Sequence, residues 1–126
     1  NLDRERLLEE VLAPLRQGQL VSFRRFDCHS LTLLPPVAVA PSSLAVVEGS
    51  YSLHPELAPM YDISVCLTLS PELQRRRILA RNGETMARRF FERWIPLEQA
   101  YFDAMKPQTR CGFLIEADQL SDEAPL

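Results

Sequence analysis

Arginine supplies nearly all of the positive charge in this 126-residue chain, with thirteen arginines against one lysine. Seven of the arginines lie within residues 75–93, where only two glutamates oppose them. Arg77 and Arg81 are four residues apart, so they share one face of a helix. Guanidinium groups hold phosphate oxygens through paired N–H donors, and the cluster therefore indicates a polyphosphate site that includes Arg88 and Arg89. A solvated helix face is the alternative interpretation, and the residue pattern leaves both open.

One carboxylate stands at the end of an apolar run. Residues 44–47 are Leu-Ala-Val-Val, and Glu48 and Gly49 follow them directly. Ligands of parallel sheets bind beyond the carboxyl ends of the strands. Glu48 is therefore a candidate ligand of Mg²⁺ at a phosphate site, directly or through water. A strand-end acid that caps the next turn or pairs with an arginine fits the same residues, and this alternative stays open.

A third group of candidates lies between two predicted strands. His29 follows Phe26 and Asp27 closely. Its imidazole can hydrogen-bond to a polar ligand while the Phe26 ring stacks on a base. A lone histidine is more often structural, so the pattern alone does not decide. The other histidine, His54, has no partner suggested by the sequence, and we expect it at the surface.

The elements that must position these residues follow from hydrophobic periodicity. Residues 3–17 predict an amphipathic helix with Asp3 as its N-cap and Gly18 as its stop. We expect strands at 21–28 and 31–40, with prolines marking the second as an edge strand. The continuous apolar runs 44–49 and 62–70 predict strands that are buried on both faces, as in a parallel sheet.

The rest of the chain predicts helices and one more strand. A short helical turn within 54–61 precedes a helix over 71–83 that ends at the Asn82-Gly83 pair. A long helix over 84–106, kinked at Pro96, and a strand over 112–117 complete the order. The break at Gly83 would let the chain turn back and bring the later arginines toward the earlier ones. This succession of strands and helices places the chain in the α/β class.

Composition describes one ordinary globular domain. Hydrophobic residues make up 46% and charged residues 25% of the chain, as in typical soluble proteins. A net charge of −3 does not favour nucleic acid, and no apolar run approaches the ~20 residues of a membrane span. The three cysteines form no CxxC pair, so neither a zinc site nor a disulfide framework is indicated, and we expect a reducing, cytoplasmic setting.

Several stretches taken together resemble the uridine kinase group of P-loop kinases. They are VVEGSYSLHPEL at 46–57, YDISVCLTLSPELQRRRILARNGE at 61–84 and RRFFERWIPLEQAYFDAMKP at 88–107, with NLD at 1–3 and FDCHS at 26–30. The likeness runs from residue 1 to about residue 118 and rests on the order and spacing of the stretches. It implies a P-loop NTPase-like parallel sheet with flanking helices, and transfer of phosphate from ATP, with Mg²⁺, to a nucleoside hydroxyl.

The resemblance also implies which residues bind the nucleoside. Asp3 matches an aspartate that contacts the ribose of the substrate. Phe26 stands where the family has a tyrosine beside the base, and His29 stands near a base-contacting histidine. Because the corner between the two strands is shorter here than in typical uridine kinases, the identity of the acceptor stays open.

The catalytic and phosphate-binding positions follow from the same resemblance. Glu48 matches the acid after the third strand, near the metal and the phosphates. Arg77 matches a catalytic arginine of the lid, and Arg81 falls one position from a second one. Arg88 and Arg89 stand in for the later lid arginines that bind phosphate.

Two parts of such a kinase are absent from these 126 residues. The four glycines are isolated from one another and Lys106 follows no glycine loop, so there is no GxxxxGK[ST] motif to cradle the phosphates. The family's catalytic aspartate and the mid-sheet strand before the P-loop are also missing. We therefore expect residues 1–126 to be one partial domain of a longer kinase. Residues 1–40 would form its substrate-binding helix and β arm, and 41–126 its sheet, lid and helices.

Two functions follow as hypotheses from different classes. In the first, the chain is the C-terminal part of an ATP-dependent kinase that acts on a small molecule, and residues 1–126 alone are inactive. In the second, it is a non-catalytic binding or interaction module derived from such a kinase. Neither hypothesis requires nucleic acid or a membrane as partner, and homo-oligomerisation stays open.

Overall fold

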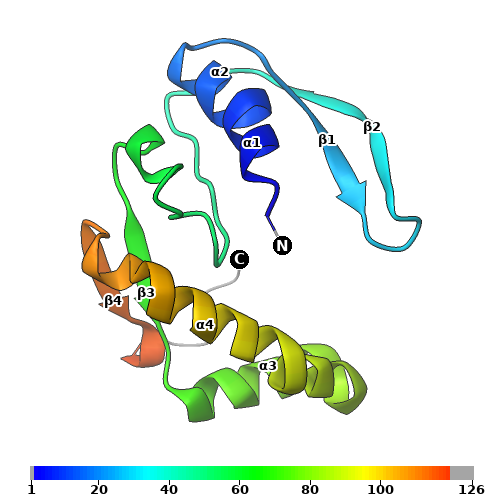
Figure 1. The fold of residues 1–126 in the computed structure, drawn as a ribbon, viewed down its shortest axis with the longest axis vertical. Helices are drawn as coiled ribbons and strands as arrows, with labels where there is room; N and C mark the ends of the chain where they lie inside the picture. Colours follow the sequence, from blue (N-terminus) through cyan, green and yellow to red (C-terminus); the bar gives the residue numbers. More distant parts are fainter. Residues whose placement is uncertain (1, 120–126) are drawn as a thin grey trace. The chain divides into compact units, whose positions relative to one another are not determined.

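The computed structural model describes residues 2–119, except for the side chain of Gln119, as a small α/β protein with two separate two-stranded sheets. The chain divides into two compact units, Asn1–Asp62 and Ile63–Leu126 (Figure 1). Residues 41–62 therefore group with the N-terminal helix and hairpin. Among residues 2–119, no helix combines the length and the apolar character that crossing a membrane requires.

The first unit begins with the predicted helix, which comprises α1 (Arg4–Leu7), a π-helical turn at Leu8–Leu12 and α2 (Ala13–Arg16). Asp3 is the N-cap, because its Oδ1 accepts a hydrogen bond from the Arg6 N–H at 3.1 Å. Gly18 ends the helix with a φ of +64°. The Gly18 and Gln19 N–H groups bond back to the carbonyls of Leu15 and Pro14, which is a Schellman motif. The predicted helix and both of its boundaries are confirmed.

The π-helical turn has a local cause in the sequence. A proline inside a helix cannot donate to the carbonyl four residues earlier, and its ring crowds that carbonyl. For Pro14 this carbonyl belongs to Glu10, which lies inside the π-helical turn Leu8–Leu12. The wider turn accommodates the proline without ending the helix.

An antiparallel hairpin follows, formed by β1 (Val21–Asp27) and β2 (Thr32–Val39). Both predicted strands are confirmed. Their register slips between Arg24 and Phe26, opposite the two prolines of β2. Proline has no N–H to give to a ladder, so it interrupts the pairing at this point, where β2 carries one residue more than β1 and forms a bulge.

The core of the first unit is small and includes a histidine. Leu12, Val21 and Leu57 are buried, with Leu57 in the turns that precede a 3-10 turn at Ala58–Met60. His54 is only 9% exposed, so its predicted surface position is wrong. The Leu57 and Ala58 N–H groups both donate to the His54 carbonyl oxygen. His54 therefore lies in a hydrogen-bonded turn, and its side chain is buried there.

The apolar run before Glu48 has no regular secondary structure and belongs to neither sheet. Leu44 and Val46 are 74% and 79% exposed. The prediction of a strand buried on both faces over 44–49 is therefore wrong for this structure. An extended segment becomes a strand only when a neighbour pairs with its backbone, and a run of apolar residues cannot supply that neighbour by itself.

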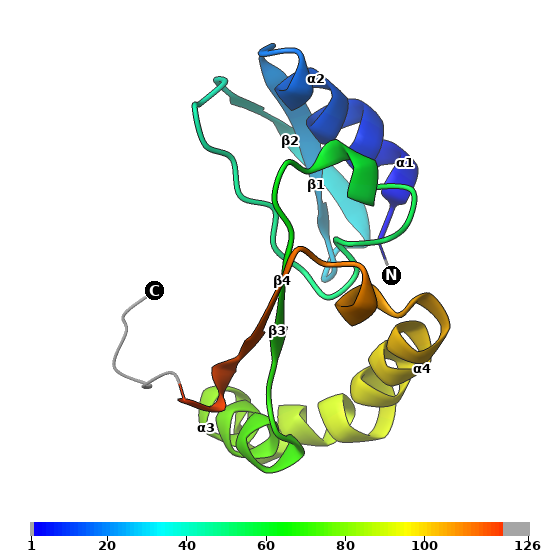
Figure 2. The same cartoon turned by 90° about the vertical axis from the view of Figure 1, so that its left-hand side faces the viewer.

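The second unit contains a parallel pair of strands, β3 (Val65–Thr68) and β4 (Phe113–Glu116), which lie side by side in Figure 2. Val65 is opposite Phe113 and Leu67 is opposite Ile115, so these four side chains share one face. All four are exposed. Both strands were expected, but the prediction that 62–70 is buried on both faces is wrong, because a sheet of two strands cannot enclose its own apolar face.

Helices connect the two strands of this pair. They are α3 (Pro71–Arg89), a π-helical turn at Phe90–Trp94, α4 (Ile95–Met105) and a 3-10 turn at Pro107–Thr109, with another at Ala117–Gln119 after β4. The predicted break is confirmed, because Gly83 interrupts α3 with non-helical φ and ψ angles of 70° and 171°. Pro96 again follows a π-helical turn that contains the residue four positions earlier, Glu92.

Candidate functional site

Three arginines of α3 line one pocket on the second unit. The pocket has a volume of about 740 Å³, and Arg76, Arg77 and Arg81 reach it from the first half of α3. One carboxylate, Glu98, is also part of the lining, so the positive charges outnumber the negative one. Apolar lining comes from Leu69, Ile78, Ala80, Phe90 and Ile95. The pocket is therefore apolar in its walls and positive where the guanidinium groups enter it.

The reversal at Gly83 builds this pocket. The chain turns back after the first half of α3, as Figure 1 shows, so Phe90 and Phe91 lie against arginines that precede the break. The Arg81 guanidinium carbon lies 5.9 Å from the centre of the Phe90 ring, and that of Arg75 lies 4.3 Å from the Phe91 ring. Such cation–π contacts hold the two helical segments together and fix the direction of the guanidinium groups.

The start of α3, the helix that carries the pocket arginines, is held by the segment after β4. Ser70 is the N-cap, and its N–H donates to Asp118 Oδ1 at 2.8 Å. Hydrogen bonds from Ser70 lower the pKa of Asp118, and the nearby Arg77 lowers it further. Arg77 is half-buried, and Ile78 beside it is part of the buried core. The segment after β4 therefore ties down the helix that carries the pocket arginines.

Arg88 and Arg89 lie on the second half of α3 and are exposed. Arg88 Nε donates to Glu92 Oε1 at 2.7 Å, an ion pair one helical turn apart that raises the pKa of Arg88. Neither arginine is among the residues that line the pocket of Arg77 and Arg81. The described structure thus brings together the two predicted catalytic arginines, but not the two predicted phosphate-binding ones.

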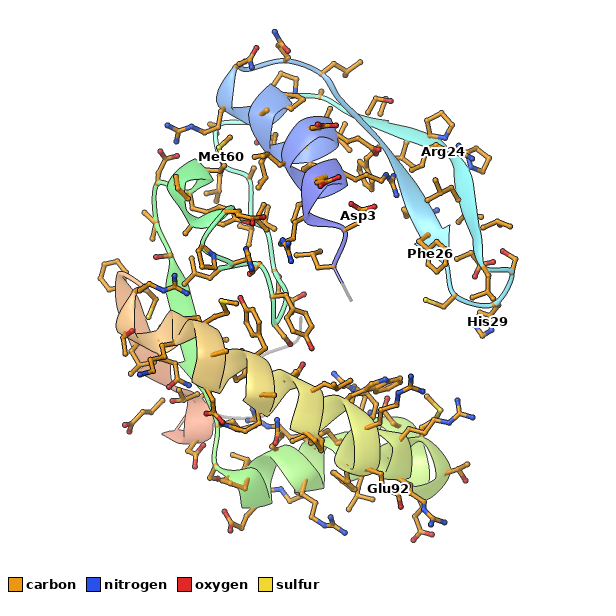
Figure 3. The ribbon with its side chains drawn as sticks, in the orientation of Figure 1. Asp3, Arg24, Phe26, His29, Met60 and Glu92 are labelled. Atoms are coloured by element: carbon orange, nitrogen blue, oxygen red, sulfur yellow. The ribbon has the colours of Figure 1, made fainter. Side chains whose placement is uncertain are left out.

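The predicted nucleoside-binding residues all belong to the first unit. Asp3 starts α1, while Phe26 lies near the end of β1 and His29 in the turn of the hairpin (Figure 3). All three side chains are exposed. A carboxylate has about four lone-pair positions, so capping of the helix leaves Asp3 able to accept further hydrogen bonds from a ligand.

The hairpin turn that carries His29 is held by Asp27. Its Oδ1 accepts from the His29 N–H at 3.0 Å, and its Oδ2 accepts from the Ser30 hydroxyl at 2.7 Å. These bonds, with the Ser30 hydroxyl as the largest contributor, lower the pKa of Asp27. Leu31 has a positive φ of 55° within the same turn. The tip therefore has a defined backbone, and the imidazole is presented on a fixed support.

Glu48 lies in the first unit, at the end of the apolar run 44–47 and directly before the turn that begins at Gly49. Its side chain is exposed. Within residues 2–119, no three His, Cys, Asp or Glu side chains gather as a metal-binding group. Mg²⁺ is commonly held by one or two carboxylates together with substrate phosphates, so a single acid such as Glu48 fits that kind of site.

Some pocket residues were not anticipated from the sequence. Arg76, Phe90 and Glu98 line the pocket. Arg76 is one of the seven clustered arginines but was not singled out among them, and neither Phe90 nor Glu98 was a candidate. The available signal was the Gly83 break, which folds residue 90 back onto residue 81. Helical spacing alone could not show this, because the contact crosses the reversal.

Neither a scan against models of known protein families nor a search of curated proteins finds a match to this chain.

Proposed function

We propose that this chain is the C-terminal part of an ATP-dependent small-molecule kinase, which transfers the γ-phosphoryl group to a hydroxyl of a nucleoside. The observation that carries the proposal is the convergence of Arg76, Arg77 and Arg81 on one pocket. Phosphoryl transfer is catalysed mainly by positioning and by fixed positive groups that stabilise the charge on the phosphates. The sequence resemblance to uridine kinases supports the same reaction.

In the proposed reaction the arginines bind the transferred γ-phosphoryl group and the other phosphates of ATP. A guanidinium group has five N–H donors, so Arg77 can bind phosphate while it also interacts with Asp118. The cation–π contact of Arg81 with Phe90 fixes its position before a ligand binds. This arrangement costs little reorganisation at the moment of transfer.

The acceptor and the metal would be handled by the first unit. The Asp3 carboxylate accepts hydrogen bonds from ribose hydroxyls, and the exposed Phe26 ring offers a face on which a base can stack, beside His29. Glu48 would hold Mg²⁺, directly or through water, and the metal would neutralise charge on the phosphates. Substitution Glu48→Gln should lower Mg²⁺-dependent turnover by about tenfold or more, and unchanged turnover would leave Glu48 without this role.

The uncovered apolar face of the parallel pair supports the view that further strands and helices belong to this sheet. Parallel sheets occur almost always with both faces covered by helices. Here the face formed by Val65, Leu67, Phe113 and Ile115 is exposed. A longer kinase would supply the P-loop strand and helix that such a sheet requires.

The same exposed face also favours the second candidate, a non-catalytic interaction module. Contiguous exposed apolar side chains commonly mark a surface that binds another protein. The two candidates differ in turnover, because only the kinase consumes ATP in the presence of an acceptor.

The test uses the protein expressed with its upstream reading frame and measures ATP consumption with Mg²⁺ and a panel of nucleosides, pantothenate and sugars. Arg77→Ala should lower kcat/KM by about 100-fold, because it removes a donor aimed at the phosphates. Arg93→Ala is the matched control, since Arg93 is exposed and is not among the pocket-lining residues. Equal effects of the two substitutions would contradict the proposed role of the pocket.

A further inference from the structure

A cluster of three charged residues joins the first helix to the hairpin. Arg6 and Glu10 are one turn apart and form a two-pronged ion pair, with Nε–Oε1 and Nη2–Oε2 distances of 2.6 Å and 2.8 Å. The same Arg6 Nη2 donates to the carbonyl oxygen of Arg24 at 2.8 Å. Glu10 Oε2 accepts from the Arg24 N–H at 3.3 Å. One helical ion pair therefore binds both backbone groups of one strand residue.

The bound residue lies at the irregular point of the hairpin. Arg24 is opposite Pro36, and the register slips directly after it. Its own side chain crosses to β2, where Nε and Nη2 donate to the carbonyls of Leu34 and Leu33 at 2.8 Å each. These donors satisfy two carbonyl groups of β2 at the point where the register slips. Arg24 is thus tied to the helix through its backbone and to the other strand through its side chain.

Arg6 and Glu10 each stabilise the charged form of the other. Hydrogen bonds from Arg6, and then from the Arg24 N–H, lower the pKa of Glu10, and the pKa of Arg6 is raised in turn by Glu10. The Arg6 and Glu10 side chains are 29% and 31% exposed, so water screens the pair less than at an open surface. Two-pronged geometry also fixes direction as well as distance.

The cluster lies between the two parts of the proposed acceptor site. Arg6 is bonded through its backbone N–H to Asp3, and Arg24 precedes Phe26 by two residues along β1. Figure 3 shows Asp3 at the start of the helix and Phe26 and His29 beyond Arg24 toward the hairpin tip. A change in the angle between helix and hairpin would therefore separate the Asp3 carboxylate from the aromatic side chains.

We propose that Arg6, Glu10 and Arg24 form a positioning clamp, which sets the distance between Asp3 and the hairpin tip to suit a ligand with hydroxyl groups and a flat ring. The inference rests on the proposed function, because it concerns the acceptor site of that reaction. None of the three residues needs to touch the acceptor. They act through the backbone of residue 24, whose position determines where Phe26 and His29 stand.

The test compares Glu10→Ala with Glu9→Ala in the protein that carries the upstream region. Glu9 is the matched control, since it is exposed on the same π-helical turn. Glu10→Ala should weaken uridine binding, measured by calorimetry, by about tenfold, and raise the KM for the acceptor by a similar factor, with the KM for ATP unchanged. Glu10→Gln, which keeps one acceptor oxygen, should restore part of the affinity.

Backbone hydrogen exchange separates positioning from folding. The Arg24 amide should exchange faster in Glu10→Ala than in Glu9→Ala, while the exchange of amides in α3 stays the same. Equal uridine affinity in both variants would overturn the clamp, and so would absence of uridine binding by the wild type. If the wild type binds uridine more tightly than Glu10→Ala but transfers no phosphate, the clamp stands and the proposed kinase function fails.

Discussion

At the scale of single residues, Asp118 connects the turn after β4 to the helix that carries the pocket. Its carboxylate accepts from the Ser70 N–H, and its pKa is lowered by Ser70 and then by Arg77. A carboxylate whose pKa is lower in the folded state stabilises the fold above its unfolded pKa, and this contribution is lost as the pH falls through the folded value. Asp118 is therefore stabilising at neutral pH and not in acid.

This linkage predicts a pH-dependent effect of Asp118→Asn. The wild type should unfold at a higher temperature than the variant near pH 7, and the difference should shrink as the pH falls below the ordinary value of 3.8. Thermal unfolding at a series of pH values measures it. Glu116→Gln is the control, since Glu116 is an exposed acid on β4. A difference that stays the same from pH 7 to pH 3 would contradict the ionic role.

The cysteines give a second prediction at this scale. Burial, and then a hydrogen bond with the Cys111 thiol, raises the pKa of Cys66 to about 11, whereas Cys28 is exposed on the hairpin. The thiolate is the reactive form, so Cys66 should react slowly with DTNB at pH 8. The fast phase should disappear in Cys28→Ser and persist in Cys66→Ser. Loss of the fast phase in Cys66→Ser would show that the burial of Cys66 is wrong.

At the scale of elements, local signals predicted most of the structure. Asp3 and Gly18 mark the ends of the first helix because a cap and a left-handed residue act within one turn. Gly83 marks the reversal for a similar reason. The sequence predicted a kink at Pro96, but it did not predict the π-helical turns before Pro14 and Pro96. A proline predicts that the helix is distorted, but it does not predict that the distortion is a π-helical turn.

Gly83 provides the prediction for this scale. Its φ of 70° and ψ of 171° fall in a region that is essentially restricted to glycine, and a Cβ there would meet nothing within 4 Å. The cost of a substitution is therefore in the backbone. Gly83→Asn should lower the free energy of unfolding in urea by about 1–3 kcal/mol. Gly18→Asn should cost less, because asparagine tolerates the left-handed conformation at a helix end, and the reverse order would contradict this account.

At the scale of the whole molecule, burial was the property that the sequence could not predict. The runs 44–49 and 62–70 are as apolar as buried strands, yet Leu44, Val46 and Leu67 are exposed. Hydrophobicity shows that a segment gains from burial, while the cover must come from other segments. For the same reason spacing could predict that Arg77 and Arg81 share a helix face, but could not predict that Phe90 lines the same pocket, because Phe90 reaches it through a chain reversal.

We propose that the arginine-lined pocket serves phosphoryl transfer from ATP to a hydroxyl acceptor. The most direct measurement follows the label from γ-³²P-ATP in the presence of Mg²⁺ and uridine, with the protein expressed together with its upstream region. We expect labelled uridine phosphate with the wild type, and about 100-fold less with Arg77→Ala than with Arg93→Ala. No labelled product from uridine or any other acceptor of the panel would contradict it.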